Sequence, residues 1–123
     1  MAAQAIDIQA NIKKAIGSHG MWKTRLQEAI ASGKSEFTVS GVSADNNCDF
    51  GKWLRGDLSL RAGSAHYDKV RQLHAEFHKE VARILGLALA GKKAEALKAM
   101  ESKTPYVKLS SDLTSEMMAW ARD

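Results

Sequence analysis

The sequence predicts an all-α fold, an up-down helical bundle with three to four long helices and one short helix that carries the only cysteine. Apolar residues recur at steps of three and four in several long segments, and no segment has a convincing strand pattern. Amphipathic helices without strands can bury their apolar faces only against one another. The length of 123 residues fits one domain, which we expect to span residues 1–123.

The first helix is predicted over about residues 5–31. The residues of its apolar face lie three or four positions apart: Ile8, Ile12, Ile16, His19, Trp22, Leu26 and Ile30. Gly17 and Gly20 weaken this helix locally. Residues 33–47 are rich in Gly, Ser, Asn and Asp, which predicts a loop, with a short extended piece at residues 37–39.

The short helix is predicted over residues 48–55, where Asn46 or Asn47 can cap its start and Gly56 can end it in a left-handed conformation. The clearest helix follows at residues 64–90. Its apolar positions alternate in steps of three and four, the pattern of a bundle seam: Tyr67, Val70, His74, Phe77, Val81, Ile84 and Ala88. Gly91 is a suitable stop for this helix.

The end of the chain predicts two further helical segments. Residues 92–103 continue the helical pattern weakly. Thr104 and Pro105 are typical of an N-cap followed by a first-turn proline, which predicts a new helix at this point. Its inward residues are Leu109, Leu113, Met117 and Trp120. One long helix with a kink at Pro105 is the alternative.

Charge and hydropathy exclude some partners. The net charge is +4, but the basic residues occur singly or in short pairs such as Lys13 and Lys14, so we expect no nucleic-acid partner. No apolar run approaches the roughly 20 residues that span a bilayer, and the N-terminus lacks the pattern of a signal peptide. We therefore expect a cytoplasmic protein without membrane insertion.

A single cysteine accompanied by histidines indicates metal binding or thiol chemistry. His74 and His78 are four positions apart on a predicted helix, so their rings lie about 6 Å apart along its axis and can bind one ion. Cys48 lies at the predicted start of the short helix, where the helix dipole favours the thiolate that zinc requires. His66 precedes His74 by about 12 Å along the helix, too far to share the ion.

His19 lies on the apolar face of the first helix, so its ring is predicted to point into the bundle. Together with Cys48 and the His74–His78 pair, it would complete a tetrahedral zinc shell. A plainer interpretation stays open, because a lone histidine on an apolar face is more often a hydrogen-bonded core residue. A free buried cysteine also usually behaves as a small hydrophobe.

Three motifs carry a family resemblance: His19-Gly20-Met21-Trp22-Lys23, Cys48-Asp49-Phe50-Gly51-Lys52-Trp53-Leu54 and His74-Ala75-Glu76-Phe77-His78. In order and separation they resemble the motifs of the chemoreceptor zinc-binding (CZB) domain family, over nearly the whole chain. The resemblance implies a Zn²⁺ ion held within a helical bundle by His19, Cys48, His74 and His78.

Domains of this family occur at the ends of bacterial chemoreceptors and beside diguanylate cyclases, where zinc, or oxidants acting on the cysteine, regulate the output. The resemblance therefore implies a regulatory or sensory module of chemotaxis or cyclic-di-GMP signalling, with a chemoreceptor or diguanylate cyclase as partner and a homodimer as its assembly.

Two other functions are alternatives to a sensor. A helical adaptor would act through an exposed surface and keep its zinc site as a purely structural element. A zinc hydrolase needs an open coordination position and a carboxylate base, yet Glu76 follows His74 by two residues and points roughly 200° away around the helix. We expect no enzymatic activity.

Overall fold

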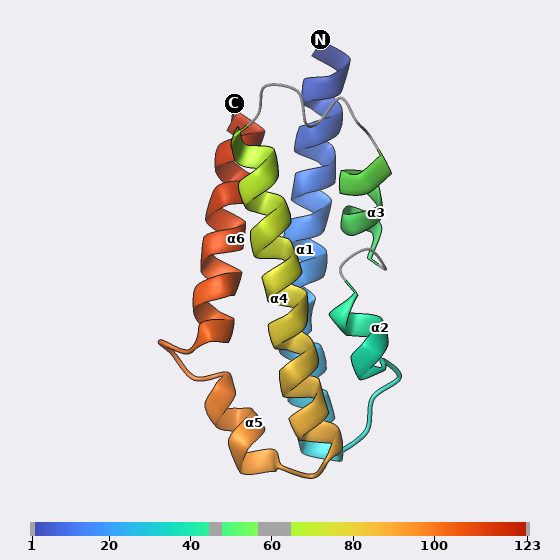
Figure 1. Ribbon diagram of the computed structural model, residues 1–123, viewed down its shortest axis with the longest axis vertical. Coiled ribbons are helices and arrows are strands. Elements are labelled where there is room, and N and C mark those ends of the chain that lie inside the picture. Colours follow the sequence, from blue (N-terminus) through green and yellow to red (C-terminus); the bar gives the residue numbers. More distant parts are fainter. Residues whose placement is uncertain (1, 45–47, 57–64, 123) are drawn as a thin grey trace.

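A computed structural model describes residues 2–44, 48–56 and 65–122, which form six helices and no strand (Figure 1). The three long helices are α1 (Ala2–Ser32), α4 (Ala65–Leu89) and α6 (Pro105–Arg122). The three short helices are α2 (Val39–Ser43), α3 (Asp49–Gly56) and α5 (Lys93–Ala99). The prediction of an all-α bundle is confirmed.

The chain alternates direction from one pass to the next, as expected for an up-down bundle. In Figure 1, α1 and α4 run downward, α6 runs upward, and the segment from α2 to α3 climbs between the end of α1 and the start of α4. The second pass is thus made of two short helices where a regular bundle has one long helix. Because α2 packs on α4 and α3 packs on both α1 and α4, this pass lies against the two helices that carry the predicted histidine ligands.

Helix α2 corrects the prediction of a loop over residues 33–47. Thr38 is its N-cap, with extended backbone angles of φ −102° and ψ 151°, and its hydroxyl accepts a hydrogen bond from the N–H of Gly41 at 3.1 Å. A Cβ atom on Gly41 would lie 2.7 Å from that hydroxyl oxygen, so glycine leaves room for the cap. Of the extended piece predicted at residues 37–39, Thr38 has extended backbone angles, whereas Val39 is already the first residue of the helix.

Helix α3 begins at Asp49, so Cys48 is the residue immediately before it, and the predicted caps Asn46 and Asn47 lie outside the described residues. Gly56 is the last residue of α3.

Helix α4 ends at Leu89, and the predicted Gly91 lies in the turn that closes it. Gly91 has a φ of 78°, its N–H donates to the Ala88 carbonyl at 3.2 Å, and the N–H of Lys92 donates to the Leu87 carbonyl at 2.9 Å. This pair of bonds is the Schellman motif, in which a left-handed glycine allows the last carbonyls of a helix to be satisfied.

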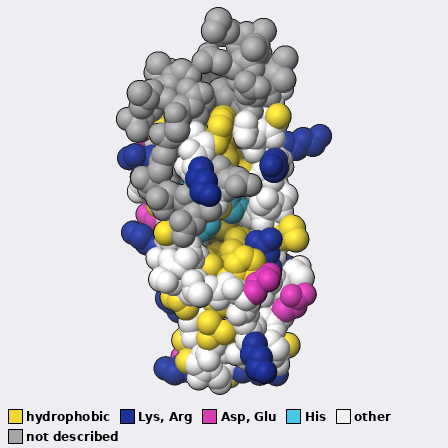
Figure 2. Space-filling view, turned by 90° about the vertical axis from the view of Figure 1, so that its right-hand side faces the viewer, with side chains coloured by type: hydrophobic (Ala, Val, Ile, Leu, Met, Phe, Trp, Pro, Cys, Tyr) yellow, Lys and Arg dark blue, Asp and Glu magenta, His cyan; other side chains and the backbone are white. Residues whose placement is uncertain are grey.

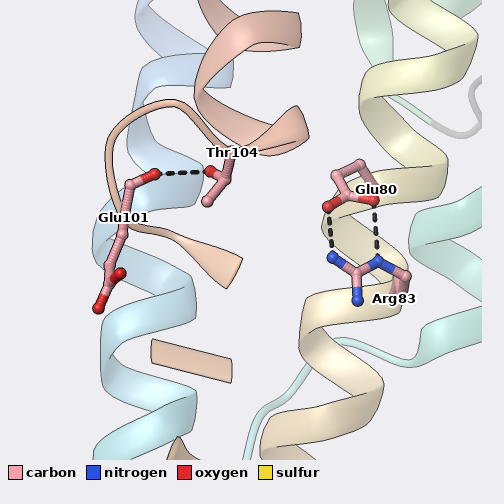
Figure 3. Close-up of polar contacts among 4 residues, drawn as sticks. All are labelled: Glu80, Arg83, Glu101 and Thr104. Atoms are coloured by element: carbon pink, nitrogen blue, oxygen red, sulfur yellow. Dashed lines mark hydrogen bonds and ion pairs between the residues drawn. The ribbon is translucent and has the colours of Figure 1, made fainter. Parts of the chain in front are cut away.

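The segment after α4 forms two helices, so the alternative of one kinked helix is wrong. Helix α5 ends at Ala99, and α6 starts at Pro105 as predicted. Between them Lys103 takes a left-handed φ of 69°, and the Thr104 hydroxyl donates to the Glu101 carbonyl at 2.6 Å (Figure 3). The turn is therefore fixed by local bonds before the proline begins the new helix.

The core lies where α1, α4 and α6 meet, and it confirms most of the predicted apolar faces. Every seam position predicted in α4 is buried. In α1 and α6 the buried members of the predicted faces are Ile12, His19, Trp22, Leu26, Ile30, Leu113, Met117 and Trp120. Ile16 and Leu109 are only partly buried, and the side chain of Ile8 lies outside the described part.

The outer face of α4 is polar. There Arg83 makes a two-pronged ion pair with Glu80, with N–O distances of 2.9 and 2.6 Å (Figure 3). In the described part of the chain, none of the helices combines the length with the apolar character that crossing a bilayer requires.

Candidate metal centre

The structure brings His19, Cys48, His74 and His78 together, although they come from three separate elements. His19 projects from the middle of α1, Cys48 precedes α3, and the other two histidines lie one turn apart on α4. One ligand atom from each residue lies within 4.8 Å of all the others. The three rings are nearly withdrawn from solvent, at 7%, 0% and 3% exposure in chain order, whereas Cys48 is partly exposed.

The Nε2 atom of His74 lies at the middle of this cluster. It is 3.1 Å from Nε2 of His19, 3.1 Å from Nε2 of His78 and 3.2 Å from Sγ of Cys48. An imidazole nitrogen carries one hydrogen or one lone pair, so it cannot hydrogen-bond to three partners at once. A hydrogen-bond network therefore does not account for the cluster.

Four of the six donor–donor distances are close to those of a tetrahedral shell around a zinc ion, whereas the cluster as a whole spreads over as much as 4.8 Å. Zn–N bonds of about 2.0–2.1 Å and Zn–S bonds of about 2.3 Å place neighbouring nitrogens about 3.3 Å apart and a nitrogen about 3.6 Å from the sulfur. The three distances to His74 fall slightly below these values, and the 3.9 Å between Cys48 Sγ and His19 Nε2 falls slightly above. Three imidazoles and one thiolate are also a donor set that suits zinc.

The sulfur of Cys48 is held by the first turn of α3. The N–H of Gly51 donates to Sγ at 3.3 Å, and the N–H of Lys52 donates to the Cys48 carbonyl at 3.0 Å. Cys48 is therefore the N-cap of α3, with its sulfur in the place of a capping oxygen. The N–H donor and the positive end of the helix both favour the thiolate form, which is the form that binds metal.

The ring of His78 is oriented from α2. Its Nδ1–H donates to the Val42 carbonyl at 2.9 Å, which fixes the tautomer and leaves the Nε2 lone pair facing the cluster. Sequence reasoning missed Val42, because a backbone carbonyl leaves no trace in the sequence. The Thr38 cap was the one local signal for a helix here.

Burial keeps the ring of His19 neutral. It lowers the pKa of His19 from 6.5 to about 4, and the nearby His78 and the positive charge of Arg25 act in the same direction. The carbonyl of Ala15, one turn earlier in α1, acts in the opposite direction and is outweighed. A neutral imidazole is the state that a metal ligand needs.

Phenylalanine rings surround the histidines. Phe50 makes T-shaped contacts with His19 and His74, with ring centroids 5.9 and 5.1 Å apart, and the centroid of Phe77 lies 5.5 Å from that of His19. Such an apolar layer limits water access and strengthens electrostatic interactions within the cluster. Phe77 was predicted as a core residue, but the part played by Phe50 was not.

His66 and Glu76 lie apart from the cluster. Nδ1 of His66 is 3.5 Å from a carboxylate oxygen of Glu116 in α6, and Lys69 shares that carboxylate at 3.5 Å. Glu76 is exposed whereas His74 is completely buried, so the two side chains leave α4 on different faces. Glu76 is thus not placed to act as a base at the cluster.

A model of the chemoreceptor zinc-binding domain family matches residues 19–85, more than half of the chain. The chain belongs to this family. The match begins at His19 and contains all four clustered residues, and zinc is the metal cofactor of this domain. No curated protein and no solved structure matches the sequence significantly.

The chemoreceptor zinc-binding domain has a sensory role and is not a catalytic family. This chain is accordingly a zinc-binding signalling domain, and its cluster combines a closed set of four donors with a partly exposed sulfur.

Proposed function

We propose that this chain is a cytoplasmic sensory module that binds one zinc ion through His19, Cys48, His74 and His78. We further propose that zinc occupancy or oxidation of Cys48 regulates a bacterial output of chemotaxis or cyclic-di-GMP type. The single observation that carries this proposal is the convergence of four donor atoms within 4.8 Å in a chain of this family. The partner is a chemoreceptor or a diguanylate cyclase, and the assembly is a homodimer.

The cluster supports zinc binding through its charge state. Burial keeps His19 neutral, the hydrogen bond to Val42 directs the lone pair of His78, and the first turn of α3 stabilises the Cys48 thiolate. A bound zinc ion would supply the positive charge that compensates this partly exposed thiolate, with the three neutral imidazoles around it. Because the ligands belong to α1, α4 and the start of α3, their release frees α3 relative to the long helices.

Cys48 is the ligand that is suited to carry a signal. It is partly exposed whereas His74 and His78 are buried, and it lies immediately before a helix of eight residues. A peroxide can transfer one oxygen atom to the thiolate, giving a sulfenate at Cys48 and releasing water. The sulfenate is a poorer zinc ligand, so α3 would lose its link to the histidines.

Metal analysis of purified protein tests the ligand assignment. We expect one zinc per chain, a sharp fall in Cys48→Ala and His74→Ala, and little change in the matched control His66→Ala. His66 lies on the same helix and pairs with Glu116, outside the cluster. Equal zinc content in Cys48→Ala and His66→Ala would overturn the assignment.

A structural zinc site in a helical adaptor is the second candidate, and the near-complete burial of the three histidines favours it. Peroxide treatment distinguishes the two. In a sensor, one equivalent of sulfenate at Cys48 releases zinc and changes the amide spectrum of α3. In an adaptor, zinc and the spectrum are retained.

A further inference from the structure

A cavity of about 520 Å³ lies between α1 and the segment of the chain around α2. Its volume is in the range of small-molecule sites, which is about 300–1,000 Å³. It reaches from His19 to Arg25, six residues along α1, which corresponds to about 9 Å of helix axis. The cavity therefore extends well beyond the metal cluster.

Figure 2 shows the side of the molecule toward which α2 and α3 lie in Figure 1. Histidine side chains are visible there at the bottom of a hollow, with apolar side chains beside them and charged side chains around the edge. The hollow is thus open to solvent on this face, which a small molecule needs in order to enter.

One part of the cavity wall is apolar and aromatic, and polar or charged residues make up the other half of the lining. Trp22 and Phe37 lie with ring centroids 4.9 Å apart, and Ala15, Val42 and Phe50 continue the lining toward the metal cluster. These side chains can cover an apolar ligand body, because aromatic walls bury much surface with little loss of conformational entropy.

One end of the cavity carries a positioned cation. The guanidinium carbon of Arg25 lies 5.0 Å from the ring centroid of Trp22 and 5.0 Å from that of Phe37. Arg25 forms no ion pair with any carboxylate among the described residues, although Glu36 also lines the cavity. A stacked guanidinium with donors to spare suits two-pronged binding of a carboxylate.

We propose that this cavity binds a small organic carboxylate, with its carboxylate on Arg25 and its apolar body against Trp22, Phe37 and the wall toward His19. Lys14 lines the cavity about 16 Å from Arg25 along the axis of α1. Lys14 and Arg25 outnumber Glu36, so the charged side chains of the described lining carry a net positive charge. A phosphate dianion fits less well, since a single guanidinium faces apolar walls. The proposal rests on Arg25, Trp22 and Phe37, which are not among the proposed metal ligands, although His19, Cys48 and His78 also line the cavity.

The proposed carboxylate site adjoins the four proposed metal ligands. Val42 lines the cavity and accepts the hydrogen bond from Nδ1 of His78, so a bound ligand contacts the element that orients one histidine of the cluster. A carboxylate would thereby act as a second input to the sensory domain.

Titration of the protein as purified tests the proposal, with phenylacetate as probe and phenylacetamide as its neutral counterpart. The indole N–H signal of Trp22 in an NMR spectrum reports binding, and Trp53 and Trp120 serve as internal references because neither lines the cavity. We expect a saturable shift of the Trp22 signal with phenylacetate and at least tenfold weaker binding of the amide.

Two variants and a control locate the site. Arg25→Gln should weaken phenylacetate binding at least tenfold. Lys23→Gln, which removes the same charge from an exposed position of α1 outside the cavity, should change it less than twofold. Ser18→Phe should block the cavity while leaving Arg25 in place.

Equal binding of acid and amide, equal affinity in Arg25→Gln and Lys23→Gln, or unchanged binding in Ser18→Phe would each overturn the proposal. If Arg25→Gln does not fold, the acid–amide comparison and Ser18→Phe decide. Zinc content measured on the same samples tests the metal ligands separately, so failure of one proposal is distinguishable from failure of the other.

Discussion

Helix α4 has two sides that are stabilised by different means. Toward α6 it presents apolar and aromatic side chains, such as Phe77, whose ring stacks on Tyr106 at 5.9 Å with 28° between the planes. Toward α1, α2 and α3 it presents His74 and His78, whose polar atoms meet other polar atoms in the interior. Figure 1 shows α6 on one side of α4 and α2 and α3 on the other. The first side is held by burial of apolar surface, and the second surrounds the four proposed metal ligands.

This difference separates folding from sensing. Apolar packing of α4 on α6 does not depend on metal or redox state, so it supplies a constant scaffold. The opposite side carries the four proposed metal ligands, and under the proposed function their atoms would be protonated, oxidised or deprived of an ion. Under the proposed function, a signal would change the position of α2 and α3 while the three long helices stay packed.

The largest expected effect comes from truncating a buried apolar side chain between α4 and α6. Leu113 in α6 is 2% exposed, so Leu113→Ala should lower the free energy of unfolding by about 2–5 kcal/mol. Urea unfolding should give the same loss with zinc and after chelation. Leu97→Ala is the control, because Leu97 is 48% exposed and should cost less than about 0.5 kcal/mol. A loss at Leu113 that disappears on chelation would mean that the two sides are not independent.

A pH dependence of the zinc-free protein should come from the metal side. The unfolded chain binds a proton on His19 near pH 6.5, whereas the folded chain does so only near pH 4. Stability from the neutral ring is thus fully present above about pH 6.5 and is lost as the pH falls toward 4. The whole shift corresponds to about 3 kcal/mol.

Urea unfolding of chelated protein at several pH values measures this loss. His19→Leu is the matched variant, since it keeps the volume but cannot take up a proton, and its stability should fall less over the same interval. An identical fall in both proteins would assign the pH dependence to other groups.

The sequence predicted the long helices and the three clustered histidines because both leave periodic traces, whereas Cys48 was singled out as the only cysteine, at the predicted start of a helix. His74 and His78 lie four apart within a seam of apolar residues, and His19 falls on an apolar face, so helical geometry alone aims all three rings inward.

Features made by the backbone or by tertiary contact left no such trace. Helix α2 has five residues, too few for a periodic pattern, and the Val42 carbonyl that orients His78 is common to every residue type. The stacking of Arg25 on Trp22 and Phe37 joins segments that only the fold brings together.

The smallest expected effect concerns how α3 is fastened to α4. The buried hydroxyl of Tyr67 donates to the Leu54 carbonyl at 2.8 Å, and this bond joins the helix that follows Cys48 to the scaffold. Tyr67→Phe should lower the free energy of unfolding by about 1 kcal/mol. It should also weaken zinc binding severalfold, because the thiolate is then held less firmly.

Tyr106→Phe is the matched control for this change, since no hydrogen bond joins the Tyr106 hydroxyl to another described residue and its ring stays stacked on Phe77. It should leave zinc affinity unchanged in a competition titration with a chelating dye. If Tyr67→Phe weakens zinc binding and Tyr106→Phe does not, the position of α3 controls the zinc affinity of the four clustered residues. Equal affinities in the two variants would mean that the ligands hold α3 without help from the scaffold, so release of Cys48 would be the only step needed to free it.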